Sequence, residues 1–256
     1  MLEVNNLSFS YNKNYKKQYV IEDINFRIKD KDILCIIGAN GSGKTTILKS
    51  ICNLIDFKGN IFLNRENIKN KNRVDLSKNI AFMNQIPDIY FSYSVYDTIM
   101  LGRYSNFRDK LFSQPNDDDK EIVLNYIDKL NLMSLKDRSI NEISGGELHR
   151  VFLARVFSQE PNIIILDEPT NHLDINNKIE LINNLKEWVN SKENRAIISV
   201  LHDINIALYF ANKILVLKNG KCIYFGDVLD FDISILNYVY DANIREYMNN
   251  LSKIWN

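Results

Sequence analysis

Residues 33–46 read Ile-Leu-Cys-Ile-Ile-Gly-Ala-Asn-Gly-Ser-Gly-Lys-Thr-Thr, and the rest of the expected fold is arranged around them. Its second half fits G-x-x-x-x-G-K-S/T, the pattern of a phosphate-binding loop. The run Ile33–Ile37 is short, apolar and rich in β-branched residues, as in a strand buried on both faces. Apolar residues then recur at helical spacing from Ile47 to Ile55. The sequence therefore predicts a strand, a glycine loop and a helix N-terminus in succession.

The loop residues suit phosphate for separate chemical reasons. Glycines let backbone N–H groups point at phosphate oxygens, and the helix end adds partial positive charge. We expect Lys44 to reach the β- and γ-phosphates and the Thr45 hydroxyl to ligate Mg²⁺. A chance glycine turn is the alternative, but four fixed positions arise in such a chain only on the order of once in a hundred. The expected binding residues are Gly38, Asn40, Gly41, Ser42, Gly43, Lys44, Thr45 and Thr46.

Composition bounds the class of protein. The 256 residues suffice for one α/β domain, and 32 Lys and Arg balance 32 Asp and Glu, which argues against a nucleic-acid partner. The three cysteines have no C-x-x-C spacing and the three histidines no zinc-ligand spacing, so free thiols in a reducing compartment are expected. The start is no signal peptide, and no apolar run approaches the ~20 residues that span a bilayer. A cytoplasmic protein, reaching a membrane only through a partner, is expected.

Hydropathy patterns around the loop predict further strands. Leu2–Phe9 and Val20–Ile28 alternate in polarity and read as an antiparallel edge, joined by a polar hairpin tip at 12–18. Ile61–Leu63 and Ile80–Met83 read as short strands that follow the phosphate-loop helix.

The stretch from Ile86 to Glu142 is polar and helical in pattern. One helix is expected over Val95–Arg103, and Asp118 with Glu121 matches an N-terminal capping pattern for the next. The acidic triplet 117–119 is interpreted as a solvated helix start in preference to a cation site. The apolar face of that second helix is formed by Ile122, Val123, Tyr126, Ile127 and Leu130.

Ser144-Gly145-Gly146-Glu147 precedes another helix with a clear apolar face. Ser144 and Glu147 by themselves satisfy a capping box, so a well-capped helix is one interpretation. The other is that the two glycines let a phosphate approach the same helix end closely. Both interpretations remain open on this segment alone.

Two further strands end in polar residues. Ile163–Leu166 runs into Asp167-Glu168, and Ala196–Leu201 runs into His202. Because carboxyl ends of parallel strands face the ligand crevice, Asp167 is placed for Mg²⁺ and Glu168 for holding or deprotonating an attacking water. His202 is expected at the same edge, as a catalytic contact to the γ-phosphate. The alternatives are acids that cap a turn and an ordinary structural histidine.

The order of these motifs carries a resemblance. The phosphate loop, Gln85, segment 144–147, strand 163–168, Asn171-His172-Leu173-Asp174 and His202 follow one another as in the ATP-binding subunit of ABC transporters, which the chain closely resembles over essentially its whole length. The resemblance implies an α/β fold: a P-loop NTPase core with an antiparallel β edge and an inserted α-helical subdomain. It also implies hydrolysis of ATP with Mg²⁺. Each ATP would lie in a head-to-tail dimer, between one subunit's P-loop and Ser144, Gly145 and Gly146 of the other.

The same resemblance sets the expected boundaries. A single ABC ATPase domain would cover 1–256. Its nucleotide-binding core would comprise 1–85 and 147–225, its helical subdomain 86–146, and a short C-terminal helical tail 226–256.

The resemblance also implies individual roles. Tyr11 would stack on adenine, with Tyr15 and Tyr19 as nearby competitors. Gln85 would contact Mg²⁺ and link the core to the helical insert, and Asp174 would belong to the loop that crosses the dimer interface.

The signature departs from the usual residues at three positions. Ile143 replaces Leu, Glu147 replaces the commonest Gln, and His149 stands where Gln is common. None of these is a phosphate donor, so ATP binding is still expected. Arg150 is interpreted as structural.

Subfamily features favour import of an iron siderophore, haem or cobalamin. Three segments resemble those of importers of these substrates: Met100–Tyr104, Asn171–Asp174 and Leu201–Asn205. There Gly102-Arg103 lies near the surface that receives the permease's coupling helix, so a charge reversal at Arg103 should uncouple transport and spare ATP binding. The expected partners are a second, identical ATPase subunit, integral-membrane permease subunits and, indirectly, a substrate-binding protein. The expected place is peripheral, on the cytoplasmic face of the cell membrane.

Several alternatives stay open. The subunit could serve an importer of another substrate, or an exporter, since substrate specificity lies in other chains. A soluble ABC ATPase of translation or DNA repair is disfavoured by the single domain and the absence of heptads. A P-loop kinase or GTPase is disfavoured by the Ser144–Glu147 segment.

Overall fold

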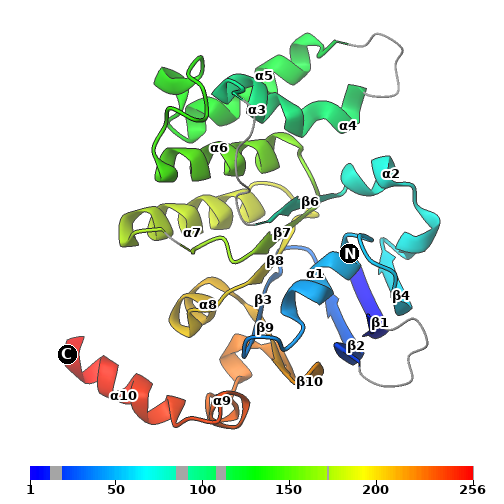
Figure 1. Ribbon diagram of the computed structural model, residues 1–256, viewed down its shortest axis with the longest axis vertical. Helices are drawn as coiled ribbons and strands as arrows, with labels where there is room; N and C mark the ends of the chain where they lie inside the picture. The colour runs from blue at the N-terminus through cyan, green and yellow to red at the C-terminus, as the bar shows by residue number, and fades with distance from the viewer. Residues whose placement is uncertain (12–18, 85–91, 108–113, 172, 256) are drawn as a thin grey trace. The chain divides into compact units, whose positions relative to one another are not determined.

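The computed structural model (Figure 1) forms two compact units. Unit 1 comprises Met1–Asn70 and Ile198–Asn256, and unit 2 comprises Lys71–Ile197. The described residues are 1–11, 19–84, 92–107, 114–171 and 173–255. The expected hairpin tip at 12–18, with Tyr15, and also Gln85 and His172, lie outside them.

An antiparallel sheet forms one part of unit 1, as the sequence predicts. Its strands are β1 (Leu2–Phe9), β2 (Ile21–Ile28), β4 (Lys58–Leu63) and β5 (Glu66–Asn67), in the order β2-β1-β4-β5. The pattern of buried and exposed residues along β2 alternates, because successive side chains point to opposite faces. A short 3₁₀ helix η1 (Ile68–Asn70) follows β5.

A second, mixed sheet of unit 1 carries the phosphate loop. Strand β3 (Ile33–Gly38) is buried along its whole length and runs parallel to β9 (Lys213–Lys218). Strand β9 pairs antiparallel with β10 (Lys221–Asp227). The boundary between the units falls inside β8 (Ala196–Val200), after which α8 (Ile204–Phe210) begins.

Helix α1 (Lys44–Ile51) is shorter than the apolar pattern predicts. Asn53 adopts a left-handed φ of 53°. The N–H of Leu54 donates to the Lys49 carbonyl (2.9 Å), and the N–H of Asn53 to that of Ser50 (3.0 Å). This pair of bonds is a Schellman motif, which ends the helix, so Leu54 is exposed and not on a helical face.

The C-terminal part of unit 1 contains η4 (Val228–Asp230), α9 (Ser234–Tyr240) and α10 (Ile244–Trp255). Leu236 and Val239 of α9 are buried, and α9 packs on β9. Asp241, at a left-handed φ of 52°, separates α9 from α10.

Unit 2 contains two parallel strands, β6 (Ile80–Met83) and β7 (Ile163–Asp167). Helix α2 (Arg73–Ser77) precedes β6, and α7 (Ile175–Asn190) follows β7. The backbone N–H groups of Asn162 and Ile163 both donate to the Asn79 carbonyl at 2.9 Å, which sets the start of this pairing.

The helical part of unit 2 packs around α6 (Gly145–Ser158), with α3 (Val95–Met100) and α5 (Asp117–Lys129) against it (Figure 1). The helix expected over Val95–Arg103 is α3 (Val95–Met100), after which the chain tightens into the 3₁₀ turn η2 (Leu101–Arg103). Helix α4 (Tyr104–Phe107) follows directly. In the described part of the chain no helix is long and apolar enough to cross a membrane.

The cap of α5 (Asp117–Lys129) differs from the expectation. The capping box joins Asn116 and Asp119, two residues before the pair Asp118 and Glu121. Both patterns place an acid three residues after a capping residue, but the earlier box lets Asp119 turn inward. The apolar face is as predicted, with Val123, Tyr126 and Ile127 buried, and the turn η3 (Met133–Leu135) follows.

Candidate functional site

The glycine loop of unit 1 requires its glycines for steric reasons. Gly43 caps α1 at a φ of 98°, and a Cβ there would lie 2.3 Å from Cγ2 of Ile21. A Cβ on Gly38 would lie 2.4 Å from the Leu217 carbonyl oxygen. The loop can therefore follow this path only without side chains at these two positions.

The start of α1 is suited to an anion. Gly43 makes no side-chain cap bond, and the first turn holds no acidic residue that would oppose the positive end of the helix dipole. The Ser42 hydroxyl is buried and has no hydrogen-bond partner among the described residues. The helix end and the Ser42 hydroxyl fit a phosphate group, which would supply an acceptor for that hydroxyl.

Lys44 lies within the loop that it is expected to serve. The residue is 6% exposed, and its Nζ donates to the carbonyls of Gly38 (2.8 Å) and Ala39 (3.1 Å). These two bonds hold the ammonium group at the loop. A charge held by carbonyls can still attract an anionic phosphate.

Three other residues of unit 1 bear on the loop or on the expected nucleotide contacts. Tyr11 is 83% exposed and sets its ring edge-on to Phe9, and His202 is exposed just after β8. Tyr240 was not predicted. Burial raises the pKa of its hydroxyl, and a hydrogen bond with the Gly38 backbone opposes that rise. This contact ties the C-terminal part of the chain to the first glycine of the loop.

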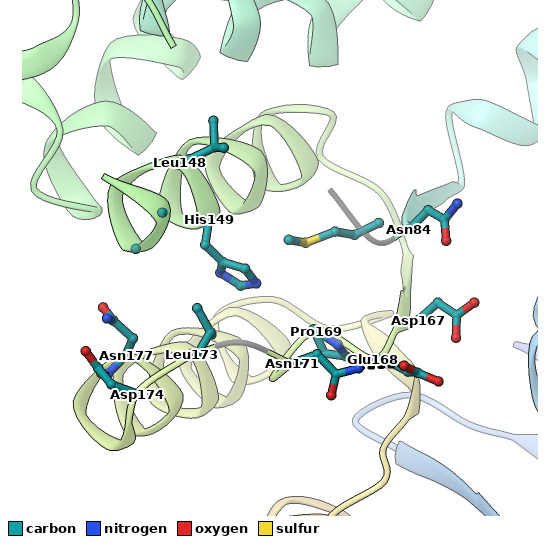
Figure 2. Close-up of a pocket in the computed structure, with 13 residues that line it drawn as sticks. Asn84, Leu148, His149, Asp167, Glu168, Pro169, Asn171, Leu173, Asp174 and Asn177 are labelled. Carbon is teal, nitrogen blue, oxygen red and sulfur yellow. Dashed lines mark hydrogen bonds between the residues drawn. The ribbon is translucent and has the colours of Figure 1, made fainter. Parts of the chain in front are cut away.

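A cavity of about 440 Å³ in unit 2 gathers the other predicted residues (Figure 2). Helix α6 borders it on one side and the chain from β7 to α7 on the other. Predicted site residues among its lining are Gly145, Gly146, Asp167, Glu168 and Asp174. The remaining lining residues are Met83, Asn84, Leu148, His149, Pro169, Asn171, Leu173 and Asn177.

The start of α6 has the predicted capping box. The Ser144 N–H and hydroxyl each donate to Glu147 Oε2 at 2.7 Å, and the Glu147 N–H donates to Ser144 Oγ at 3.3 Å. The two bonds to the carboxylate, first that of the hydroxyl and then that of the N–H, lower the pKa of Glu147. A Cβ on Gly145 would meet open space, whereas one on Gly146 would lie 2.9 Å from Asn177. The helix is thus well capped, and its first residue, Gly145, faces an open approach.

Two acidic residues, Asp167 and Glu168, lie at the end of β7, the first notable for its burial and the second for its backbone conformation. Asp167 is 5% exposed, and Glu168 follows at a left-handed φ of 54°, uncommon for a residue with a side chain. Asn171 Nδ2 donates to Glu168 Oε2 at 2.6 Å, and the Asn171 N–H to the Glu168 carbonyl at 3.2 Å. Asp174 caps α7 through the Asn177 N–H at 2.8 Å. The Glu168 carboxylate is therefore held in a defined direction.

Among the described side chains, no three His, Cys, Asp or Glu residues lie together as a metal cluster. A divalent ion held by one hydroxyl, one carboxylate and nucleotide oxygens would need no such cluster. Within unit 1 the hydroxyl of Thr45 is a donor of this kind, and within unit 2 the carboxylate of Asp167 is another.

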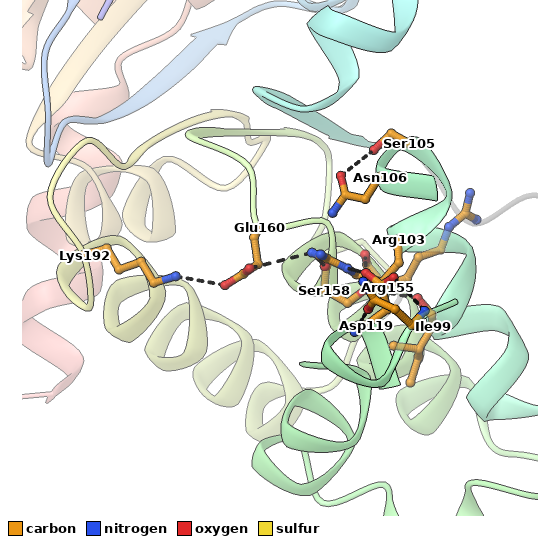
Figure 3. Close-up of polar contacts among 10 residues, drawn as sticks. Ile99, Arg103, Ser105, Asn106, Asp119, Arg155, Ser158, Glu160 and Lys192 are labelled. Atoms are coloured by element: carbon orange, nitrogen blue, oxygen red, sulfur yellow. Dashed lines mark hydrogen bonds and ion pairs between the residues drawn. The ribbon is translucent and has the colours of Figure 1, made fainter. Parts of the chain in front are cut away.

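Gly102 and Arg103 are both buried in unit 2, and Figure 3 shows the polar contacts of Arg103. A Cβ on Gly102 would lie 2.2 Å from the Arg155 carbonyl oxygen. Arg103 Nε donates to Asp119 Oδ1 at 2.8 Å, and Nη1 to the Ser158 carbonyl at 2.9 Å. Gly102-Arg103 is expected near a docking surface, and the structure shows that the Arg103 side chain itself is buried and ion-paired with Asp119. Likewise Asp119 is a buried ion-pair partner and not a solvated acid.

Arg103→Glu should therefore strongly destabilise unit 2, in addition to any effect on transport. Breaking a buried ion pair lowers the free energy of unfolding by about 3–5 kcal/mol. The new glutamate would also place a second carboxylate beside that of Asp119. Thermal unfolding would show a large drop in melting temperature. Lys120→Glu is the matched control, because Lys120 pairs with Asp117 in solvent and its reversal should change little. Equal melting temperatures for the two variants would contradict the structural role of Arg103.

Comparisons with known proteins agree on one family. A family model described as ABC transporter matches residues 21–171. An uncharacterized ABC transporter ATP-binding protein of Methanocaldococcus jannaschii is 37% identical, over 96% of this chain and 83% of that protein. The petrobactin import ATP-binding protein FpuC of Bacillus anthracis is 33% identical, over 88% of this chain and 81% of that protein. A solved transporter described as of the metal-chelate type, in an inward-facing conformation, superposes with a TM-score of 0.79 at 28% identity, covering 94% of this chain and 88% of that one.

Proposed function

This chain belongs to the ABC transporter family as an ATP-hydrolysing subunit, and from that premise we propose that it powers uptake of an iron chelate, haem or cobalamin through a separate permease. The observation that carries the substrate class is the likeness to import subunits. The petrobactin protein is 33% identical, and the iron(3+)-hydroxamate import protein of Bacillus subtilis is 30% identical over 84% of this chain. The metal-chelate transporter structure supports the same class.

The proposed ATP site is composite. The P-loop of one subunit contributes its N–H groups and Lys44, and Ser144, Gly145 and Gly146 of a second copy close over the γ-phosphate. The uncapped α1 and the open approach to Gly145 support this arrangement. Asp174 would cross between the subunits, Glu168 would act as base for the attacking water, and His202 would contact the γ-phosphate.

Mg²⁺ is proposed at Thr45, Asp167 and Gln85. When bound, the ion would neutralise charge on the β- and γ-phosphates. The hydroxyl and carboxylate of Thr45 and Asp167 are hard oxygen donors of the kind that Mg²⁺ prefers.

The domain organisation is proposed as one ABC ATPase domain, with core 1–85 and 147–225, helical subdomain 86–146 and tail 226–256. We place the subunit at the cytoplasmic face of the membrane. The surface that meets the permease is proposed around Tyr93, Leu101 and Tyr104, whose side chains are exposed in the helical part. Arg103 supports that surface from beneath.

Deletion of the gene tests the substrate class. The deletion strain should lose uptake of radiolabelled ferric siderophore, haem or cobalamin, while amino-acid and sugar uptake continue. Restoring the wild-type gene should restore uptake, and a Lys44→Ala copy should not. A deletion strain with normal uptake of all three metal compounds, and a defect in amino-acid import or drug export, would reject the substrate class and leave the ATPase assignment intact.

Tyr11→Ala should weaken ATP binding about fivefold. Loss of a stacked ring removes about 1 kcal/mol of binding free energy. The Tyr11 ring is exposed and makes an edge contact with Phe9, so its removal should change the stability of the fold little. A fluorescent-nucleotide titration measures the change, with Tyr19→Ala as control. If Tyr19→Ala weakens binding and Tyr11→Ala does not, the adenine platform lies elsewhere.

A further inference from the structure

His149 occupies a position in unit 2 that packing alone does not explain. It projects from α6 toward the chain that follows β7 (Figure 2). The residue is only 7% exposed, and its ring hydrogen-bonds the backbone of Pro169. Because proline has no N–H, the acceptor must be the Pro169 carbonyl, and the ring must donate.

The two ring nitrogens of His149 differ. Nε2 is buried and has no hydrogen-bond partner among the described residues. We therefore assign the donor to Pro169 to Nδ1, which is the tautomer of the neutral ring that this contact requires. Burial lowers the pKa of His149, which keeps the ring neutral at physiological pH.

The turn beyond Pro169 is held from its other side by Asn171. Its amide donates to the Glu168 carboxylate at 2.6 Å, and its N–H to the Glu168 carbonyl at 3.2 Å. Glu168 itself keeps a left-handed φ of 54°. Such a conformation persists in a residue with a side chain only when its surroundings hold it.

We propose that His149 and Asn171 are positioning residues that hold Glu168 in its reactive direction, His149 through the Pro169 carbonyl and Asn171 through the carboxylate. The inference rests on the proposed role of Glu168 as base. It links the helix that begins with Ser144-Gly145-Gly146 to the turn that carries the base, since His149 lies on that helix. A shift of α6 would then move Pro169 and re-aim Glu168.

Variants that keep or remove a single hydrogen-bond donor separate a positioning role from a packing role. His149→Asn places an amide nitrogen near the position of Nδ1, whereas His149→Leu fills space without a donor. Asn171→Asp keeps size but offers the Glu168 carboxylate an acceptor in place of a donor. Steady-state ATPase assays of the purified subunit should show kcat lowered roughly tenfold by His149→Leu and by Asn171→Asp, with KM for ATP within about twofold. His149→Asn should stay near the wild-type rate.

Histidine NMR provides a readout that does not involve turnover. The chain has three histidines, so ¹⁵N-histidine labelling of the nucleotide-free protein gives few signals, and His149→Leu identifies one. Long-range ¹H–¹⁵N spectra should show a neutral His149 ring protonated on Nδ1. A ring protonated on Nε2 would overturn the contact to Pro169.

The outcomes distinguish this inference from the proposed function. If Glu168→Gln abolishes turnover while His149→Leu and Asn171→Asp hydrolyse ATP like the wild type, the positioning role is rejected and Glu168 remains the base. A raised KM with a lowered melting temperature in both His149 variants would show a packing role, and would also reject the inference. If Glu168→Gln itself turns over normally, the role of Glu168 fails, and the inference falls with it.

Discussion

Lys44→Ala should weaken ATP binding by about a hundredfold or more. The side chain offers the phosphates a charged donor, and losing such bonds costs about 3 kcal/mol. The structure adds a second effect, because the alanine leaves the Gly38 and Ala39 carbonyls without the Nζ that now bonds them. Isothermal titration with Mg-ATP measures the affinity directly.

Lys49→Ala is the matched control for Lys44→Ala. Both lysines lie in α1, but Lys49 is in its last turn, away from the loop. Its loss should leave affinity within about twofold. A Lys44→Ala protein that folds and binds ATP with wild-type affinity would remove the loop from the nucleotide site.

Glu168→Gln should bind Mg-ATP and accumulate as a dimer, with hydrolysis reduced by about 10²–10⁴-fold. That range is the usual contribution of a general base. The glutamine keeps size, and its carbonyl oxygen can still accept the hydrogen bond from Asn171. Light scattering after size exclusion shows the dimer, and phosphate release shows turnover.

Glu187→Gln serves as the control for Glu168→Gln. Glu187 is an exposed glutamate on α7, so the charge is removed in unit 2 away from the end of β7. This variant should hydrolyse ATP and remain mostly monomeric without nucleotide. Rapid turnover and no dimer in Glu168→Gln would leave another residue as the base.

The features that sequence predicts well depend on neighbours in the chain. The strand and loop at 33–46 and the box at Ser144 follow from periodicity and capping over a few residues. The cap of α5 was misplaced because Asn116 and Asp118 each have an acid three residues on. The end of α1 was misplaced because the apolar pattern continues beyond Asn53, and only backbone conformation reveals the stop.

The features that sequence misses depend on contacts between distant residues. Arg103 meets the carbonyl of Ser158, and Tyr240 meets the backbone of Gly38. In each pair the partners lie far apart in sequence, and no local pattern marks either. His149 was visible only as an unusual residue in a familiar segment. Its burial and its contact to Pro169 required the fold.

The left-handed asparagines carry a consequence for how such a chain can change over time. Asn53 ends α1, Asn131 follows α5, and Asn219 turns the β9–β10 hairpin, each at a φ near 50–55°. Asparagine tolerates this conformation better than other residues with side chains, and glycine is the more usual choice. The chain has only nine glycines. Substitution of glycine by asparagine at helix ends and hairpins can therefore preserve the fold. The same substitution at Gly38, Gly43 or Gly102 cannot, because a Cβ at these positions would collide with neighbouring atoms.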